Sequence, residues 1–210
     1  LDAGGSIGNA SGLDFNFLDL DIASSVTAVA NSDIYLNEVI GDLKVSSITS
    51  TQGDITLLAG DSILDVEDDN NLSSYWSGNA DVTGSSITLV AASGSIGSRD
   101  QQLEIDSSFF ANGAVTTTSD EDTWITETSG SLRVENVVVG SGFGAYISSA
   151  GKILNALTSG DNILADTLVI KAAGNIGSSA KALTTATEKL EAYTDANLWL
   201  TNSDDLSVGG

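Results

Sequence analysis

The feature that most constrains this chain is a short phrase that recurs along it. Residues 87–98 read ITLVAASGSIGS, and residues 168–178 read LVIKAAGNIGS. Each phrase has an alternating apolar segment, a turn of small residues, and then a single Ile or Leu. That terminal aliphatic residue occurs at eight places: Ile7, Leu43, Ile63, Ile96, Leu132, Ile153, Ile176 and Leu206. Such recurrence indicates stacked repeats, in which one unit cannot bury its apolar face alone.

The alternation inside each unit has a period of two, which predicts β-strands. Successive units start 21, 32, 36, 22, 23 and 30 residues apart. The short spacings match one coil of a β-solenoid, and the long ones indicate either coils with inserted loops or two thin coils. We therefore predict an all-β fold, a right-handed parallel β-helix (β-solenoid) of roughly 8–10 coils. A β-sandwich would explain the alternation but not the recurring terminal residue.

The same pattern predicts which side chains point inward and how the turns are made. We expect an inward set of Ile34, Leu36, Ile55, Leu57, Ile87, Leu89, Leu168 and Ile170, together with the terminal aliphatic residues. The position two before each terminal residue is Gly in six cases and Asp in two. Since Gly and Asp tolerate positive φ best, a left-handed corner residue is predicted at every turn. The lack of Pro is consistent with strands that all lie inside a ladder.

A longer period lies over the short one. The flank G-(S/N)-I-G surrounds Ile7, Ile96 and Ile176. A small or basic residue and then Val follow Leu43, Leu132 and Leu206, whereas Leu follows Ile63 and Ile153. Three units therefore form one super-repeat. We treat residues 1–210 as a single solenoid segment, an internal slice of a longer repetitive protein. Its super-repeats span approximately 1–92, 93–173 and 174–210, and the last is truncated.

The composition excludes several classes of function. Twenty-nine acidic residues and seven basic ones give a formal net charge of -22, which argues against nucleic acid and anionic membrane surfaces. No apolar run approaches the ~18 residues that membrane insertion needs. With no Cys and no His, thiol and Ser-His chemistry are impossible. Regular repeats also disfavour a catalytic site, so we expect a non-enzyme with no catalytic residues and no resident cofactor.

Several quoted segments resemble one known class of repeats. ITLVAASGSIGS, DIYLNEVIGDLKV (33–45), GDITLLAGDSILD (53–65) and DTWITETSGSLRV (122–134) are similar to repeats of filamentous-haemagglutinin-like giant bacterial surface adhesins. The resemblance covers essentially the whole chain. It implies a right-handed parallel β-helix, an extracellular location on the bacterial cell surface, and a role as a shaft or adhesive surface.

One acidic run is a candidate for binding calcium. Asp65, Glu67 and Asp69 alternate along the loop after Ile63, and carboxylate oxygens are the ligands that calcium prefers. The twelve-residue calcium-loop pattern fails here, because its sixth position is Asn70 and its twelfth is Trp76. A solvated acidic loop is therefore the preferred interpretation, with calcium as the alternative.

Aromatic residues recur at an outward position and suggest an interaction surface. If Ile34 and Leu36 point inward, Tyr35 points outward, and by the same reasoning Trp124, Tyr146 and Trp199 point outward on the same sheet. Exposed aromatic rows mark contacts. The alternative is that inserted loops carrying Tyr75-Trp76 and Phe109-Phe110 cover them.

We accordingly expect a structural or adhesive segment of a large exported bacterial surface protein, forming a stiff acidic rod or filament. Its expected partners are further copies of the repeat, in the same chain or in neighbouring rods. A host or neighbouring cell surface and glycans stay open as partners. The alternative function is a β-helix that binds or cleaves carbohydrate along its long face.

Overall fold

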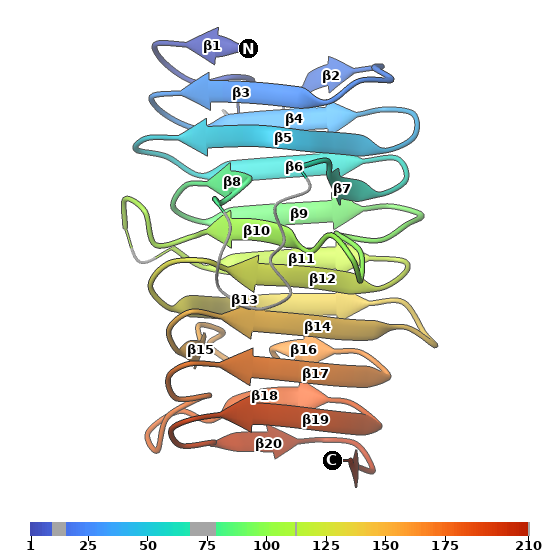
Figure 1. Cartoon of the computed structure of the whole chain (residues 1–210), viewed down its shortest axis with the longest axis vertical. Helices are drawn as coiled ribbons and strands as arrows, with labels where there is room; N and C mark the ends of the chain where they lie inside the picture. The colour runs from blue at the N-terminus through green and yellow to red at the C-terminus, as the bar shows by residue number, and fades with distance from the viewer. Residues whose placement is uncertain (10–15, 68–78, 112, 210) are drawn as a thin grey trace.

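The structure is a computed structural model that describes residues 1–9, 16–67, 79–111 and 113–209. Throughout these residues the chain winds as a stack of flattened coils, each of which contributes strands to two opposite sheets (Figure 1). Every named strand pair is parallel. The described part contains no helix, and therefore none that could cross a membrane. The predicted all-β parallel solenoid is confirmed.

The two sheets share the strands almost equally. Sheet A contains eleven strands: β1 (Asp2–Ala3), β3 (Val26–Ala30), β5 (Leu43–Ser50), β7 (Ile63–Asp65), β8 (Val82–Thr83), β10 (Leu103–Asp106), β12 (Thr123–Glu127), β14 (Gly144–Ser149), β17 (Thr167–Ala172), β19 (Lys189–Thr194) and β21 (Ser207–Val208). Sheet B contains ten strands: β2 (Leu18–Leu20), β4 (Ile34–Glu38), β6 (Ile55–Ala59), β9 (Ile87–Ala91), β11 (Val115–Ser119), β13 (Leu132–Val139), β15 (Ile153–Asn155), β16 (Ile163–Leu164), β18 (Leu183–Ala186) and β20 (Leu200–Asn202).

The core is a set of aliphatic columns that run along the stack. Leu57 of β6 pairs in register with Leu36 of β4 on one side and with Leu89 of β9 on the other. All eight predicted inward strand residues are at most 1% exposed, which confirms their assignment. Seven of the eight terminal aliphatic residues are also buried, and Leu206, which precedes the final strand β21, is 38% exposed.

The turns are built differently from the prediction of a left-handed residue at every corner. Of the eight predicted corner residues, only Gly41 and Gly130 have positive φ. At Gly94 and Gly151 the requirement is space, because an added Cβ would collide with the corner of the preceding coil. Left-handed glycines instead follow the terminal residue in each G-(S/N)-I-G flank, as at Gly97. The prediction was wrong because close stacking of corners also selects Gly.

The strand order reveals a unit that is longer than one coil. β2 to β9 form a first set and β10 to β17 a second set with matching strands. β5 and β13 are each eight residues long, and each contains a bulged residue, Ser46 or Glu135, where the register with the preceding strand shifts. Three-residue β7 and β15 then pair with the first halves of β5 and β13.

Each set exchanges the two sheets relative to the set before it. If β7 is counted with β8, and β15 with β16, a set makes seven passes between the sheets, which is three and a half coils. The first set therefore begins in sheet B and the second in sheet A. The 36-residue and 30-residue spacings are one and a half coils each, neither one looped coil nor two. Equivalent residues of successive sets thus emerge on opposite faces.

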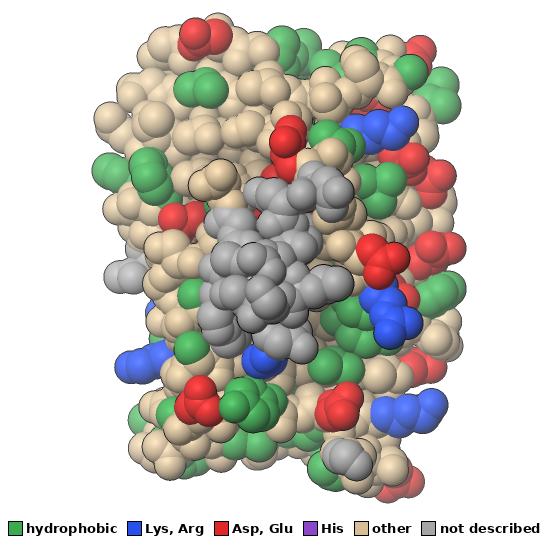
Figure 2. Space-filling view, viewed as in Figure 1, with side chains coloured by type: hydrophobic (Ala, Val, Ile, Leu, Met, Phe, Trp, Pro, Cys, Tyr) green, Lys and Arg blue, Asp and Glu red, His purple; other side chains and the backbone are tan. Residues whose placement is uncertain are grey.

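Acidic side chains concentrate at one edge of the stack. Many lie in the turns where strands of sheet B lead into sheet A: Asp42, Asp61, Asp120, Glu121 and Asp122. Figure 2 shows acidic side chains gathered along the right-hand edge of the face that it presents. Turns are where a coil meets water, so most of the charge lies outside the core.

Candidate functional site: an aromatic ledge and a buried acidic cluster

The four predicted aromatic residues do not lie on one sheet. Tyr35 lies in β4 of sheet B, whereas Trp124 and Tyr146 lie in β12 and β14 of sheet A. Trp199 precedes β20 of sheet B. Tyr35, Trp124 and Trp199 do occupy one position of the long repeat, but the odd number of passes per set places successive copies on opposite faces. The expectation of a single aromatic row was therefore wrong.

The structure brings two of the four together. Trp124 and Tyr146 are paired in register on adjacent strands, and their rings stack with centroids 3.5 Å apart and planes 3° from parallel. Both side chains are half-buried and point away from the core. We call this pair the aromatic ledge. Stacking on adjacent strands holds both rings rigidly against the face of sheet A.

The turn before the ledge fits closely against it. The backbone N–H of Trp124 donates to the Ile96 carbonyl at 2.7 Å. Gly97 has a φ of 63°, and an added Cβ would collide with the carbonyl of Trp124. The G-S-I-G turn at residues 94–97 thus packs directly against the backbone of β12 in the next coil.

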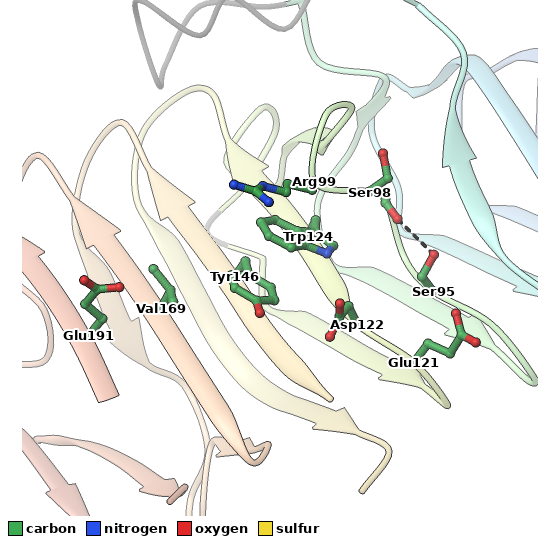
Figure 3. Close-up of a pocket in the computed structure, with 10 residues that line it drawn as sticks. Ser95, Ser98, Arg99, Glu121, Asp122, Trp124, Tyr146, Val169 and Glu191 are labelled. Atoms are coloured by element: carbon green, nitrogen blue, oxygen red, sulfur yellow. Dashed lines mark hydrogen bonds between the residues drawn. The ribbon is translucent and has the colours of Figure 1, made fainter. Parts of the chain in front are cut away.

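A depression of about 670 Å³ lies beside the ledge, as Figure 3 shows. The row of Trp124 and Tyr146 continues in register through Val169 and Glu191. Val169 is much shorter than a tyrosine, so the ring face of Tyr146 that is turned away from Trp124 borders the depression. Arg99 adjoins the other end of the row (Figure 3).

Three acidic residues line the depression, together with Arg99 and two serines. Glu121 and Asp122 lie at its edge and Glu191 at its far end. One oxygen of Asp122 accepts a hydrogen bond from the Gly144 N–H at 2.7 Å. Burial raises the pKa of the Tyr146 hydroxyl, and the negative charge of Asp122 adds to the rise while Arg99 opposes it. An aromatic face with carboxylates at its rim suits a ligand that has an apolar face and hydrogen-bond donors at its edge.

The other aromatic residues that the sequence analysis named lie apart from the ledge or outside the described residues. Tyr35 makes an edge-to-face contact with Phe17, with centroids 5.9 Å apart. Phe109 and Phe110 are 55% and 58% exposed and do not line the depression. Tyr75 and Trp76 lie outside the described residues.

A second candidate site is an acidic cluster formed by Asp65, Asp81 and Glu104. Asp65 ends β7, Asp81 precedes β8, and Glu104 lies in β10. All three side chains are buried, and one carboxylate oxygen from each lies within 4.8 Å of the others. Burial raises the pKa of Asp81 to about 9, and the nearby charges of Asp65 and Glu104 add to the rise. The N–H of Glu104 opposes it by donating to Asp81 Oδ2 at 3.0 Å.

The cluster only partly coincides with the calcium candidates taken from the sequence. Asp65 belongs to it. Glu67 does not, and its side chain accepts a hydrogen bond from Ser46 Oγ at 2.8 Å. Asp69 lies outside the described residues. Asp81 and Glu104 were missed because they are far from Asp65 in sequence, and only the stacking of coils brings the three together.

In the second set of strands, the three equivalent positions are occupied by neutral residues, namely Asn155, Asn162 and Thr184. Asn162 Nδ2 donates to Asn155 Oδ1 at 3.1 Å and to the Val134 carbonyl at 2.8 Å. Its Oδ1 accepts from both the N–H and the hydroxyl of Thr184. The N–H of Thr184 therefore repeats the contact that Glu104 makes to Asp81. Asp81 and Glu104 could have been found by aligning the sequences of the two sets, because they then fall opposite Asn162 and Thr184.

The acidic cluster can be neutralised in two ways. Three carboxylates at this spacing offer the oxygen ligands that a divalent cation such as calcium takes. Protons shared between the carboxyl groups would achieve the same neutrality, as expected for like charges at short distance. The neutral copy shows that the backbone accommodates this arrangement when amides and a hydroxyl supply the donors.

Comparisons with known proteins give no further guidance. The chain matches no protein-family model, no curated protein and no solved structure. Membership of a family is therefore not shown.

Proposed function

We propose that this chain is a structural segment of a large exported bacterial surface protein, forming part of a stiff acidic rod. The role is non-catalytic. Its neighbours are further copies of the same repeat, in the same chain or in adjacent rods.

The observation that carries the proposal is the repetition of a three-and-a-half-coil unit around columns of buried, mostly aliphatic side chains. Every coil is hydrogen-bonded to the next through two sheets, so bending the stack would disrupt ladders on both faces. A rod of this kind gains length by adding units, without a new core for each one. Acidic turns along its edge favour solubility and oppose unspecific self-association.

The proposal is tested by locating the protein on cells that make it. Antibodies raised against this segment should label thin fibres outside the cell in immunogold electron microscopy. Pre-immune serum and a strain lacking the gene serve as controls. Labelling confined to the cell interior would refute the exported role, and labelling of compact particles would refute the rod.

The aromatic ledge favours a second candidate, namely carbohydrate binding. A sugar ring presents an apolar face that can lie on the open face of Tyr146, and its hydroxyl groups can donate to carboxylates such as Glu191 and Asp122. The rings are held rigidly, so little entropy is lost on binding. Tyr35 differs from Tyr146, because its ring meets Phe17 edge-on and does not stack on a second ring there.

A glycan array distinguishes this candidate from a purely structural role. The wild-type chain and Tyr35→Ala should bind the same selected glycans, and Trp124→Ala should lose them because Tyr146 loses its stacking partner. If the wild-type chain binds no glycan, or if Trp124→Ala binds as well as Tyr35→Ala, the ledge is not a carbohydrate site.

A further inference from the structure

A buried glutamate closes one corner of the solenoid. Glu127 ends β12 and is fully buried. The N–H of Ser107, in the preceding coil, donates to both carboxylate oxygens at 3.0 and 3.2 Å. Ser107 Oγ donates to Oε2 at 2.5 Å. The side chain thus ties the end of β12 to the end of β10.

The same corner occurs three times within the part of the chain that the structure describes. Glu38 ends β4 in the first set, and Asn202 ends β20 after the second. Glu38 Oε2 accepts from the N–H of Ile22 at 3.2 Å, and Asn202 Oδ1 accepts from the N–H of Thr187 at 3.1 Å. Each of the three residues therefore receives a backbone N–H from the preceding coil.

The asparagine copy also donates, which an ionised glutamate cannot do. Asn202 Nδ2 donates to the carbonyls of Thr187 and Asp204, at 2.9 Å in each case. In the first copy, Glu38 Oε1 is buried and has no hydrogen-bond partner among the described residues. Only a protonated carboxyl group both accepts and donates as the amide does.

The surroundings of Glu127 favour the protonated form. Burial raises the pKa of Glu127 to about 8, the charge of Asp106 in β10 adds to the rise, and the hydrogen bonds from Ser107 oppose it. On the other side, β14 presents the uncharged Ser149 in register with Glu127. Burial and the charge of Asp106 thus favour the protonated carboxyl group in the folded chain.

We propose that Glu127 is a pH-responsive latch, which holds the corner between β10 and β12 closed when protonated and loosens it when ionised. The direction follows from proton linkage. Between an unfolded pKa of 4.5 and the folded value of about 8, the folded chain keeps a proton that the open chain has lost. The stability of this corner therefore falls as the pH rises through that window, and the fall ends above it.

Hydrogen exchange of the Ser107 amide measures the latch directly. Once corrected for the intrinsic exchange rate, its protection factor should fall by up to about tenfold per pH unit between pH 5 and 8, and then level off. Glu127→Gln supplies a permanent donor and should remove this slope. Glu135→Gln, at an exposed position of β13, is the matched control and should keep the wild-type slope.

Carboxyl-carbon NMR of the wild-type chain provides a second measurement that needs no variant. A Glu127 resonance that titrates near pH 8 supports the proposal. A titration near pH 4.5, or equal slopes in the wild-type chain and Glu127→Gln, would overturn it.

Discussion

Leu89 shows how tightly a single residue is specified by the stack. It is fully buried and lies between Leu57 of one coil and Thr117 of the next. Its neighbour Val90 points outward and is half-buried. One step along the strand therefore changes the environment from a dry column to a solvent-facing surface, as the period of two requires.

We expect Leu89→Asp to disrupt the coils around β9. A carboxylate in this column would have neither water nor a cation beside it, and the cost should be at least about 4 kcal/mol of unfolding free energy. Thermal unfolding followed by circular dichroism measures it. Val90→Asp, which adds the same charge on the outer face, should lose far less. Similar melting of the wild-type chain and Leu89→Asp would contradict the inward assignment.

At the scale of strands, corresponding elements of the two sets fill the same three positions with chemically different side chains. The strands β7, β8 and β10 enclose three carboxyl groups, whereas β15, β16 and β18 enclose two asparagines and a threonine. The backbone hydrogen bonds match closely: Asp81 N–H donates to the Glu104 carbonyl at 2.9 Å, and Asn162 N–H to the Thr184 carbonyl at 2.8 Å. The fold therefore tolerates either version, and the side chains alone set the energetic difference.

A reciprocal exchange between the two sites tests that difference. Asp81→Asn should stabilise the chain by about 1–2 kcal/mol, because its amide can donate to Asp65 and to the Val45 carbonyl. Asn162→Asp should destabilise it by a similar amount, because Asn155 and the Val134 carbonyl lose their donor. Urea unfolding at neutral pH in the presence of a chelator measures both. Destabilisation by Asp81→Asn would argue that the carboxylate itself is needed there.

At the scale of the whole molecule, charge opposes the compact state while the aliphatic columns maintain it. A net charge of -22 is carried mainly on turns and outer faces, where acidic groups of neighbouring coils lie close together. Because the passes per set are odd, features at one repeat position alternate between the two faces. In a longer rod built from this unit, the side chains at one repeat position would therefore appear alternately on the two faces, and not as a stripe along one face.

Salt should therefore stabilise the chain. Raising NaCl from about 10 mM to about 500 mM shortens the Debye length from about 30 Å to a few ångströms, which screens repulsion between acidic turns. We expect the melting temperature to rise by several degrees at pH 7. At pH 4 the increase should shrink, because many carboxyl groups are then neutral. An equal increase at both pH values would show that salt acts through another route.

The strands, the inward columns and the parallel stack could be predicted before any coordinates, because a period of two and a recurring terminal aliphatic residue are local patterns. Ile34, Leu36 and Leu89 could be assigned from alternation alone. Which residues meet across coils could not be predicted in this way. Trp124 stacks on Tyr146 and not on Tyr35, and Asp65 lies beside Asp81 and Glu104. These contacts depend on how many residues each coil contains. The half-coil offset between sets is likewise a property of the winding. Spacing along the chain cannot distinguish an inserted loop from an additional half turn, since both lengthen a unit without altering its pattern.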